Sequence, residues 1–318
     1  MKHFLAKAAL TAVLSAALAL PALAADYTVM APAAPGGGWD QTARAIQEAL
    51  QTEGISSNVQ VVNVPGAGGT IGLAQFAQQA KGNPNQLIVG GYVMVGAILT
   101  NKSPVTLDNV TPIARLTGEY EAIVVPTASD IQTLDDLIAK FKADPGSVSW
   151  AGGSAGGTDH IAVGLIAKAV GVDPTKINYI AFSGGGEALA AILGNQVTAG
   201  ISSLGEFRDQ IQAGQLRLLA VSSGERLEGF DAPTLKEAGV DVEVENWRMV
   251  AAGPDLTPEQ EAAIIADIEK MVNSPTWQKV LADKGWINTY LSGDEFKAQL
   301  AKDNEATAAI LKDIGLAS

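Results

Sequence analysis

The chain of 318 residues contains no cysteine. This absence excludes disulfide bonds, thiolate metal sites, a cysteine nucleophile and a cysteine that carries a lipid anchor. Histidine is scarce as well, because only His3 and His160 occur. Carboxylates would have to supply almost every ligand of a metal site, and we find no acidic cluster with the spacing of a calcium loop. We therefore expect neither a metal ion nor a cofactor.

Basic residues are few: 21 lysines and arginines stand against 34 acidic residues, which gives a formal net charge of -13. This balance argues against nucleic acid or an anionic membrane surface as a partner. It says little about the sign of a small ligand. Distant surface charges are screened by salt, whereas buried groups next to the ligand are not.

The apolar run near the N-terminus, Ala8 to Leu20, is too short to anchor the chain in a bilayer. Lys2 and Lys7 precede this run, and Ala22-Leu23-Ala24 provides the small-x-small pattern of a signal cleavage site. We expect residues 1–24 to be a signal peptide, with cleavage one residue later as the alternative. The sequence thus predicts a periplasmic protein without a lipid anchor.

Glycine is abundant, and four glycine-rich turns each join a strand-like run to a helical pattern. Glycine lets backbone N–H groups converge on one point, and the N-terminus of the following helix adds a partial positive charge. Such turns can bind an anion without lysine or arginine, and none of the four contains either residue. The turns are Pro35–Asp40, Pro65–Thr70, Gly152–Thr158 and Ser183–Glu187. We expect two lobes that each present two turns to a shared cleft, where backbone amides and hydroxyls supply most of the attraction.

The pattern along the chain alternates strands and helices, which predicts parallel sheets with helices on both faces. In such sheets the ligand lies at the carboxyl ends of the strands. The expected strands are Tyr27–Met30, Val59–Val64, Leu87–Gly90, Ser147–Trp150, Ile177–Ala181 and Leu216–Ser222. The expected helices are Trp39–Glu53, Ile71–Ala80, Leu134–Lys142, His160–Val170, Glu187–Gly194 and Glu206–Ala213.

The pattern after Thr257 no longer alternates between strands and helices. It predicts amphipathic helices without a clear strand between them. These helices are Pro258–Asn273, Pro275–Lys284 and Asp294–Ile314. Two strand-like segments, Glu121–Pro126 and Val244–Ala251, can carry the chain between the lobes and form a hinge. We therefore expect lobe one to comprise residues 26–123 plus 249–318, and lobe two residues 124–248.

Gly152-Gly153-Ser154-Ala155-Gly156 matches the Gly-x-Ser-x-Gly elbow that presents the nucleophile of serine hydrolases. The available base, His160, lies six positions downstream in the helix that the elbow itself opens. In hydrolases of this type the base comes late in the chain, after an acidic partner. We therefore favour Ser154 as a hydroxyl donor to a carboxylate and expect no catalytic residue. A secreted serine hydrolase that uses Ser154 is the alternative.

The sequence alone does not assign the roles of several other polar residues. Asp40 stands four residues before Arg44, and we expect it to order its loop or cap the helix rather than meet an anion directly. Arginine side chains can clamp a carboxylate, although we expect most of these arginines to form ion pairs at the surface or between the lobes. The sequence leaves open which of them reaches a ligand; the candidates are Arg44, Arg115, Arg208, Arg217 and Arg248.

Taken together, these motifs resemble the solute-binding proteins of the tripartite tricarboxylate transporter system, the TctC or Bug family. The resemblance spans the chain after the signal peptide. It rests on Ala34–Asp40 with Ala43-Arg44, Val64–Gly69, Gly157–His160, Phe182–Ala188 leading to Leu193–Val197, Leu218–Ser222 and Pro233–Gly239. The Gly-Gly-Gly-Glu form at residues 184–187 is similar to the citrate-type branch, which favours a di- or tricarboxylate ligand.

The resemblance implies a two-lobed α/β protein with the Venus-flytrap, type II-like periplasmic-binding-protein fold. Each lobe would hold a mainly parallel sheet flanked by helices, with two crossover strands. Such a protein delivers a small carboxylate to a large and a small integral-membrane transporter subunit. Lobe one would bind through Gly37, Gly38, Trp39, Asp40, Gly66, Ala67, Gly68, Gly69, Thr70 and Tyr92. Lobe two would bind through Ser154, Gly157, Thr158, Ser183, Gly184, Gly185, Gly186, Ser202 and Ser203.

Overall fold

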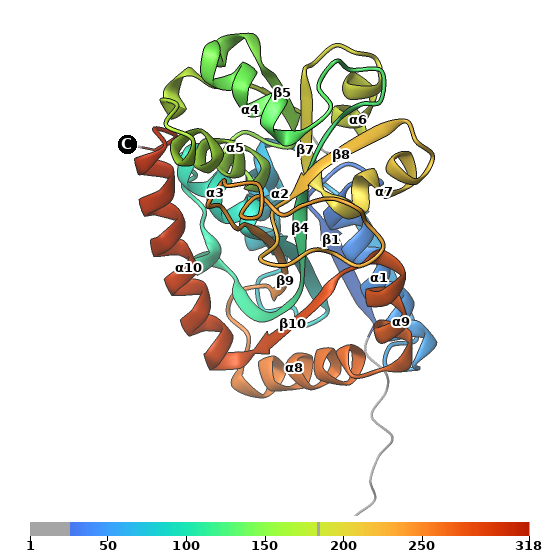
Figure 1. Ribbon diagram of the computed structural model, residues 1–318. Helices are drawn as coiled ribbons and strands as arrows, with labels where there is room; N and C mark the ends of the chain where they lie inside the picture. Colours follow the sequence, from blue (N-terminus) through green and yellow to red (C-terminus); the bar gives the residue numbers. More distant parts are fainter. Residues whose placement is uncertain (1–25, 183–184, 318) are drawn as a thin grey trace, which may run out of the picture.

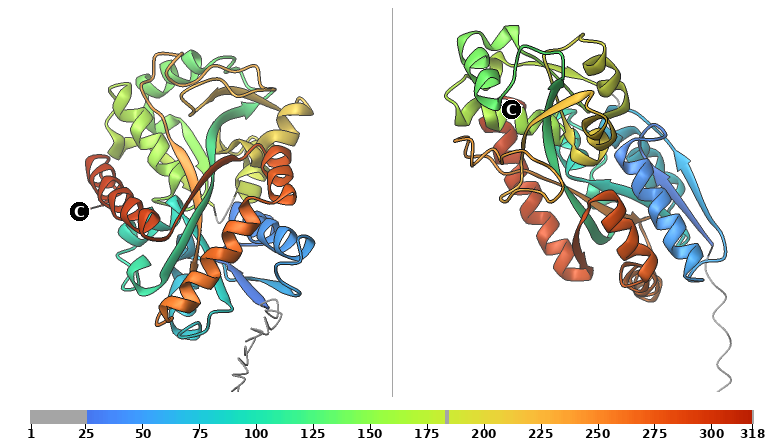
Figure 2. Two further views of the ribbon diagram at one scale, coloured as in Figure 1. Left: turned by 90° about the horizontal axis from the view of Figure 1, so that it is seen from below. Right: turned by 45° about the vertical axis from the view of Figure 1, so that its right-hand side comes forward.

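Two β-sheets that share one long strand, β4 (Thr111–Pro126), organise the chain in the computed structural model, which describes residues 26–182 and 185–317 (Figure 1). Residues 111–120 of β4 belong to the first sheet, and residues 121–126 belong to the second. The molecule is elongated, with one sheet in each half (Figure 2). The structure confirms the predicted two-lobed α/β fold.

The first sheet has the strand order β2-β1-β3-β9-β4, and β10 pairs with β4 on its other side. The first three strands of the chain are parallel to one another, whereas β9, β4 and β10 pair antiparallel. Its strands, besides β4, are β1 (Tyr27–Ala31), β2 (Val59–Asn63), β3 (Gln86–Gly91), β9 (Glu245–Ala252) and β10 (Ile287–Ser292).

The second sheet has the order β6-β5-β7-β4, with β8 on the far side of β4. Here β5, β6 and β7 are parallel, and β4 is antiparallel to both of its neighbours. Each sheet is therefore mixed, because the strands that cross between lobes add antiparallel partners to a parallel half. The remaining bounds are β5 (Ser149–Gly152), β6 (Asn178–Ala181), β7 (Ala199–Ser203) and β8 (Leu216–Val221).

Helices flank both sheets, and their ends follow local chemistry. A capping box starts α8, in which Thr257 Oγ1 accepts from the Gln260 amide and Pro258 occupies the first turn. Lobe one contains α1 (Gly38–Thr52), α2 (Thr70–Gln79), α3 (Tyr92–Thr100), α8 (Pro258–Val272), α9 (Pro275–Lys284) and α10 (Gly293–Asp313). Lobe two contains α4 (Leu134–Ala143), α5 (Thr158–Ala169), α6 (Gly185–Leu193) and α7 (Leu204–Gln212).

Each lobe has its own hydrophobic core. One large cluster surrounds the first sheet and includes Ile46, Leu87 and Trp277. Two clusters cover the two faces of the second sheet, one around the edge-to-face pair Phe141 and Trp150 and the other around Phe207. Separate cores are consistent with lobes that fold as units and move about the strands that connect them.

The C-terminal helix α10 links the lobes a third time. It begins beside the first sheet and ends next to α5 (Figure 1). There Leu311 and Ile314 pack against Ile161, and the side chain of Lys168 pairs with Asp313. The exact lobe boundaries stay a prediction, because the end of this helix contacts both halves.

Three strands and helices are absent from the sequence prediction, and β4 begins at Thr111 rather than at Glu121. The expectation of no strand between the tail helices is wrong, because β10 pairs with β4 across more than 160 positions of sequence separation. Two more elements were not predicted, α3 and β7. α3 is apolar around most of its circumference, and the five residues of β7 are small apart from Ile201, so neither shows a helical or alternating pattern.

Candidate functional site

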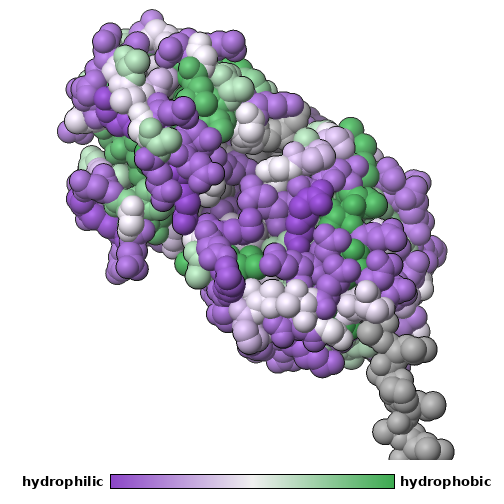
Figure 3. All heavy atoms as spheres, turned by 90° about the vertical axis from the view of Figure 1, so that its right-hand side faces the viewer, coloured by the Kyte–Doolittle hydropathy of each residue, from purple (hydrophilic) through white to green (hydrophobic). Residues whose placement is uncertain are grey.

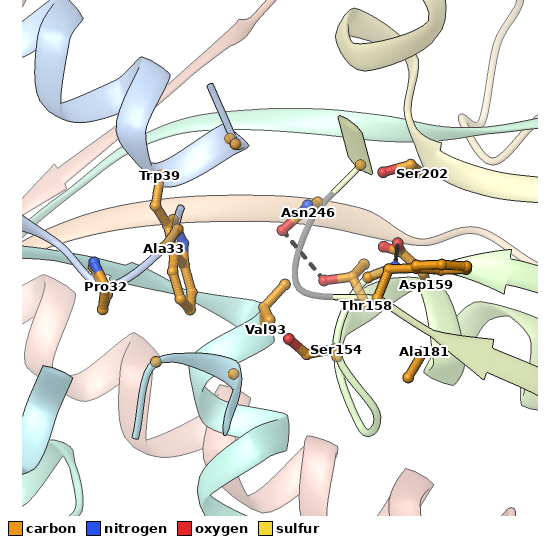
Figure 4. Close-up of a pocket in the computed structure, with 18 of the residues that line it drawn as sticks. Pro32, Ala33, Trp39, Val93, Ser154, Thr158, Asp159, Ala181, Ser202 and Asn246 are labelled. Carbon is orange, nitrogen blue, oxygen red and sulfur yellow. Dashed lines mark hydrogen bonds between the residues drawn. The ribbon is translucent and has the colours of Figure 1, made fainter. Parts of the chain in front are cut away.

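A cavity of about 290 Å³ lies between the two lobes. Trp39, Ala33 and Pro32 line one side of it, and Thr158, Asp159 and Ser202 line the other (Figure 4). The volume is at the lower end of the range for small-molecule sites. The cavity can therefore enclose a small organic molecule that contacts both lobes at once.

The lobe-one wall is built from two of the predicted turns. Gly37 is the N-cap residue of α1 and has no side chain that could cap this helix, and the Gly38 amide donates to the Glu206 carboxylate of lobe two. Gly66, Gly68 and Gly69 have φ values of 133°, 60° and 87°, which other residues rarely adopt. The Trp39 ring packs against Gly69, where an added Cβ would lie 2.6 Å from its Cζ3 atom. Backbone amides and one aromatic face thus make up most of this wall.

Asp40 holds the first turn in place. Its buried carboxylate accepts hydrogen bonds from the Gly36 amide at 2.8 Å, Asn63 Nδ2 at 2.9 Å and Arg44 Nε at 2.9 Å. Burial by itself would raise the pKa of Asp40, but the hydrogen bonds from Arg44, Gly36 and Asn63 hold it below its usual value. Asp40 therefore orders the loop, as expected, and does not line the cavity.

The lobe-two wall carries hydroxyl groups from the turn before α5 and from the end of β7. Thr158 Oγ1 lies 3.2 Å from Asn246 Oδ1, and Asn246 Nδ2 donates to Ser203 Oγ at 3.0 Å. Ser202 Oγ donates to Glu206 Oε2 at 2.5 Å. Ser154 lines the cavity and makes no side-chain hydrogen bond to the described residues. Its hydroxyl is therefore available to a ligand.

Carboxyl groups also line this wall. Asp159 and Glu206 face the cavity, and Asp159 accepts a hydrogen bond from the Gly153 amide at 2.6 Å. Burial raises the pKa of Asp159 to about 7 and also raises the pKa of Glu206. Behind them Glu121 is completely buried, and its pKa is raised well above the usual value by burial and by the nearby Asp159. This cluster was not predicted from the sequence, because acidic residues are not expected beside an anion.

Arg248 is the candidate arginine that lines the cavity. Its side chain is 4% exposed, and Nη2 lies 2.5 Å from Glu119 Oε2. The guanidinium sits over the Trp286 ring, and Nη1 has no hydrogen-bond partner among the described residues. The other arginines bind elsewhere: Arg44 to Asp40, Arg115 to Glu245, and Arg208 and Arg217 to backbone carbonyls.

Most of the residues predicted for the site do line the cavity. They are Gly37, Gly38, Trp39, Gly66, Ala67, Gly68, Gly69, Ser154, Gly157, Thr158, Gly185, Ser202 and Ser203. Ser183 and Gly184 lie outside the described residues.

Asp40, Thr70, Tyr92 and Gly186 do not line the cavity. Thr70 Oγ1 donates to the Ala67 carbonyl and so closes the turn from behind. Tyr92 packs beside Trp247, with ring centroids 6.3 Å apart. Gly186 lines a neighbouring hollow on the face that carries α1, α7 and α9, where hydrophilic residues predominate (Figure 3).

The sequence prediction missed two groups of lining residues. The mostly apolar group is Pro32, Ala33, Val93, Ala155, Ala181 and Phe182, and the polar group is Asn101, Asp159, Glu206 and Asn246, whereas Arg248 was one of the arginines whose role the sequence left open. Many are neighbours of predicted residues, so extending each motif by one or two positions would have found them. Asn101, Asn246 and Arg248 have no such signal, because tertiary packing alone brings them to the cavity.

The serine-hydrolase geometry is not formed around Ser154. His160 Nδ1 accepts a hydrogen bond from the Gly156 amide at 3.1 Å, and its ring stacks on Tyr179 with centroids 4.1 Å apart. Burial lowers the pKa of His160 to about 4, which makes it a weak base. Among residues 26–182 and 185–317, no group of three or more acidic or histidine side chains could hold a metal ion, and no helix could cross a membrane.

Comparisons with known proteins agree with this architecture. The chain is 28% identical to protein BugT from Bordetella pertussis over 312 residues, which covers 95% of this chain and 94% of the relative. A TctC solute-binding protein from Polaromonas, solved without ligand, is 28% identical to this chain and has a TM-score of 0.65. The match covers 91% of this chain and 98% of the Polaromonas protein. MatC from Rhodopseudomonas palustris, solved with bound malate, shares the fold at 22% identity and a TM-score of 0.77; the match covers 93% of this chain and 99% of MatC. The model of the tripartite tricarboxylate transporter family receptor matches residues 42–316, and the chain therefore belongs to this family of solute-binding receptors.

Proposed function

We propose that the chain is a periplasmic solute-binding receptor that captures a small organic di- or tricarboxylate, with a citrate-like ligand favoured. It delivers this ligand to the large and small integral-membrane subunits of a tripartite tricarboxylate-type transporter. Residues 1–24 serve as the signal peptide that directs the chain to the periplasm. Catalysis, a cofactor and a metal ion play no part in this function.

The observation that carries this proposal is the lobe-one wall of the cavity. Two glycine-rich turns, at Gly37 and at Gly66–Gly69, present backbone amides at the start of α1 and α2, and neither helix has a side-chain cap. Helix N-termini attract carboxylates through their free amides and their dipole. Membership of the receptor family and the malate found in MatC support the same ligand class.

The other wall supplies the second half of the proposed site. Ser154 offers a free hydroxyl, and the backbone at Gly157 and Gly185 adds amides from lobe two. Neither wall alone reaches both ends of a dicarboxylate, so the ligand favours the closed arrangement of the lobes. We propose that residues 26–123 plus 249–318 and residues 124–248 move as the two lobes.

A ligand screen tests the proposal. Thermal shift and tryptophan fluorescence should be measured with citrate, tricarballylate, malate, succinate, terephthalate and glutamate. Trp39 lines the cavity, so binding should change its emission. Micromolar binding of at least one carboxylate without turnover supports the proposal. Failure of every carboxylate to bind, or ester hydrolysis that Ser154→Ala abolishes, would refute it.

Small-angle scattering tests lobe closure. The radius of gyration should decrease when a carboxylate that the screen has identified is added. An unchanged radius, or two independent sites on separate lobes, would contradict the shared cleft. The receptor and its transporter subunits, reconstituted together, would then test delivery.

A further inference from the structure

Four carboxyl groups gather at the lobe-two end of the cavity, where the proposed function would place the second carboxylate of a ligand. Asp159 and Glu206 line the cavity, and Glu119 and Glu121 lie in the adjoining part of β4. Glu121 is 0% exposed, and neither of its carboxyl oxygens has a hydrogen-bond partner among the described residues. An ionised carboxylate in this position would have no hydrogen bond to compensate for lost hydration, and the nearby charge of Arg248 offsets only part of the cost of burial.

The nearby positive charge is already used. The cation that acts on Glu121 and Glu206 is Arg248 on β9, and it is paired with Glu119, which also accepts from Trp286 Nε1. On β6, Tyr179 donates its hydroxyl to the Gly153 carbonyl, and on α5 the buried His160 is neutral because its pKa is lowered to about 4. The remaining neighbours are the carboxyl groups of Glu121 on β4 and Glu206 on α7. Among the residues that the structure describes, Asp159 therefore has no free counter-charge.

A fully ionised dicarboxylate would thus bring negative charge next to Asp159 and Glu206 in an interior that screens charge poorly. A protonated Asp159 would remove one repulsion and would become a hydrogen-bond donor. We propose that Asp159, backed by the buried Glu121, is a proton-binding site of the cavity, and that each dicarboxylate is captured together with one proton. This inference rests on the proposed function, because it concerns how the same cavity accepts an anion.

The pKa of Asp159 decides the pH range of this effect. In the ligand-free protein this pKa is about 7, mainly because of burial. An anionic ligand raises the pKa further, because it favours the neutral acid. Affinity is then highest below about pH 7 and falls as the pH rises through the interval between the pKa of the free protein and that of the complex.

Isothermal titration calorimetry measures the captured proton directly. Malate and succinate, each an ionised dicarboxylate near neutral pH, should be titrated in two buffers of different ionisation enthalpy. The dependence of the observed enthalpy on the buffer gives the number of protons taken up. We expect close to one proton per ligand near pH 8, fewer near pH 6, and a loss of affinity of about tenfold per pH unit above pH 7.

Asp159→Asn removes the titrating group and keeps an oxygen that can accept from the Gly153 amide. This variant should take up no proton, and near pH 8 it should bind malate about tenfold more tightly than the unmodified chain. Asp130→Asn is the matched control, because Asp130 is an exposed residue of lobe two outside the cavity. The control should keep the full proton uptake and pH dependence.

Each outcome decides the proposal. Dicarboxylate binding without proton uptake, or uptake that persists in Asp159→Asn, overturns it and leaves the proposed function intact. If no carboxylate binds at any pH, the proposed function fails and this inference fails with it. The proton uptake of the unmodified chain tests the proposal even if the variant does not fold.

Discussion

The two walls of the cavity use opposite chemistry. The lobe-one wall consists of glycine amides at the starts of α1 and α2, and among the described residues the charged side chain beside it is Arg248, whose guanidinium packs against Gly38. The lobe-two wall carries Asp159 and Glu206 beside its hydroxyl groups. Arg248, at the base between them, is neutralised by Glu119.

This difference separates two tasks. Fixed backbone dipoles attract any carboxylate and need no change of protonation, so we expect the lobe-one wall to provide general affinity. Carboxyl groups on the opposite wall oppose an anion until they are protonated or meet a hydrogen-bond donor, so we expect that wall to select the ligand and its charge state. An acidic protein can therefore bind an anion through local geometry while one wall discourages the wrong ligands.

The largest expected effect is on the free energy of unfolding and comes from replacing Arg248, which lines the cavity between the two walls. Arg248→Gln leaves Glu119 buried without its counter-charge, and this should lower the free energy of unfolding by about 3–5 kcal/mol. Urea denaturation followed by tryptophan fluorescence measures the change.

Arg44→Gln is the control for that variant, since its side chain is 53% exposed and its ion pair with Asp40 should contribute less than about 1 kcal/mol. Equal losses in the two variants would show that the buried pair has no special role in holding the walls together. Glu119→Gln combined with Arg248→Gln should recover part of the lost stability.

The acidic wall should make the stability of the ligand-free protein depend on pH. The pKa of Asp159 is raised from 3.8 to about 7 in the folded state, so its neutral form is favoured by folding. Its contribution is therefore fully present below about pH 4 and is lost as the pH rises to about 7.

Asp159→Asn does not titrate, so it should be more stable than the unmodified chain by on the order of 2–3 kcal/mol near pH 8, with little difference near pH 4. Denaturation series at both pH values, without ligand, measure this. A pH-independent difference would place the titration on another group of the cluster.

The sequence predicted the glycine-rich turns of both walls better than the charged groups beside them, and the reason is physical. A glycine turn followed by a helix is a local pattern, so Gly37 and Gly66–Gly69 could be found without knowledge of the fold. The positions of Glu121 and Arg248 depend on strand pairing over long sequence distances, as in the pairing of Gly91 with Arg248. The same holds for β10, whose partner β4 could not be inferred from its own six residues.

Ser154 tests whether the lobe-two wall also contributes attraction. Ser154→Ala should make the binding free energy of a carboxylate less favourable by about 1–3 kcal/mol, which is the usual effect of removing a donor to a charged group. It should leave the free energy of unfolding unchanged. Calorimetric titration measures the affinity.

Ser147→Ala is the matched control, because Ser147 is an exposed serine of the same lobe whose hydroxyl bonds to the Asp144 carbonyl. An unchanged affinity in Ser154→Ala would mean that the second wall acts through its amides and carboxyl groups only.

The smallest effect concerns the uncapped helices of the lobe-one wall. Gly37 has extended backbone angles, with φ at -70° and ψ at 165°, which suit a serine that caps α1. Gly37→Ser should stabilise the protein by up to about 1 kcal/mol and should weaken carboxylate binding, because the new hydroxyl accepts from amides that the ligand would otherwise use.

Thr257→Ala is the opposite case: it removes the cap of α8, far from the cavity, and should lower stability by about 1 kcal/mol without changing affinity. Thermal denaturation and ligand titration of both variants separate the two effects. If Gly37→Ser binds carboxylates as tightly as the unmodified chain, the first turn of α1 does not hold the ligand.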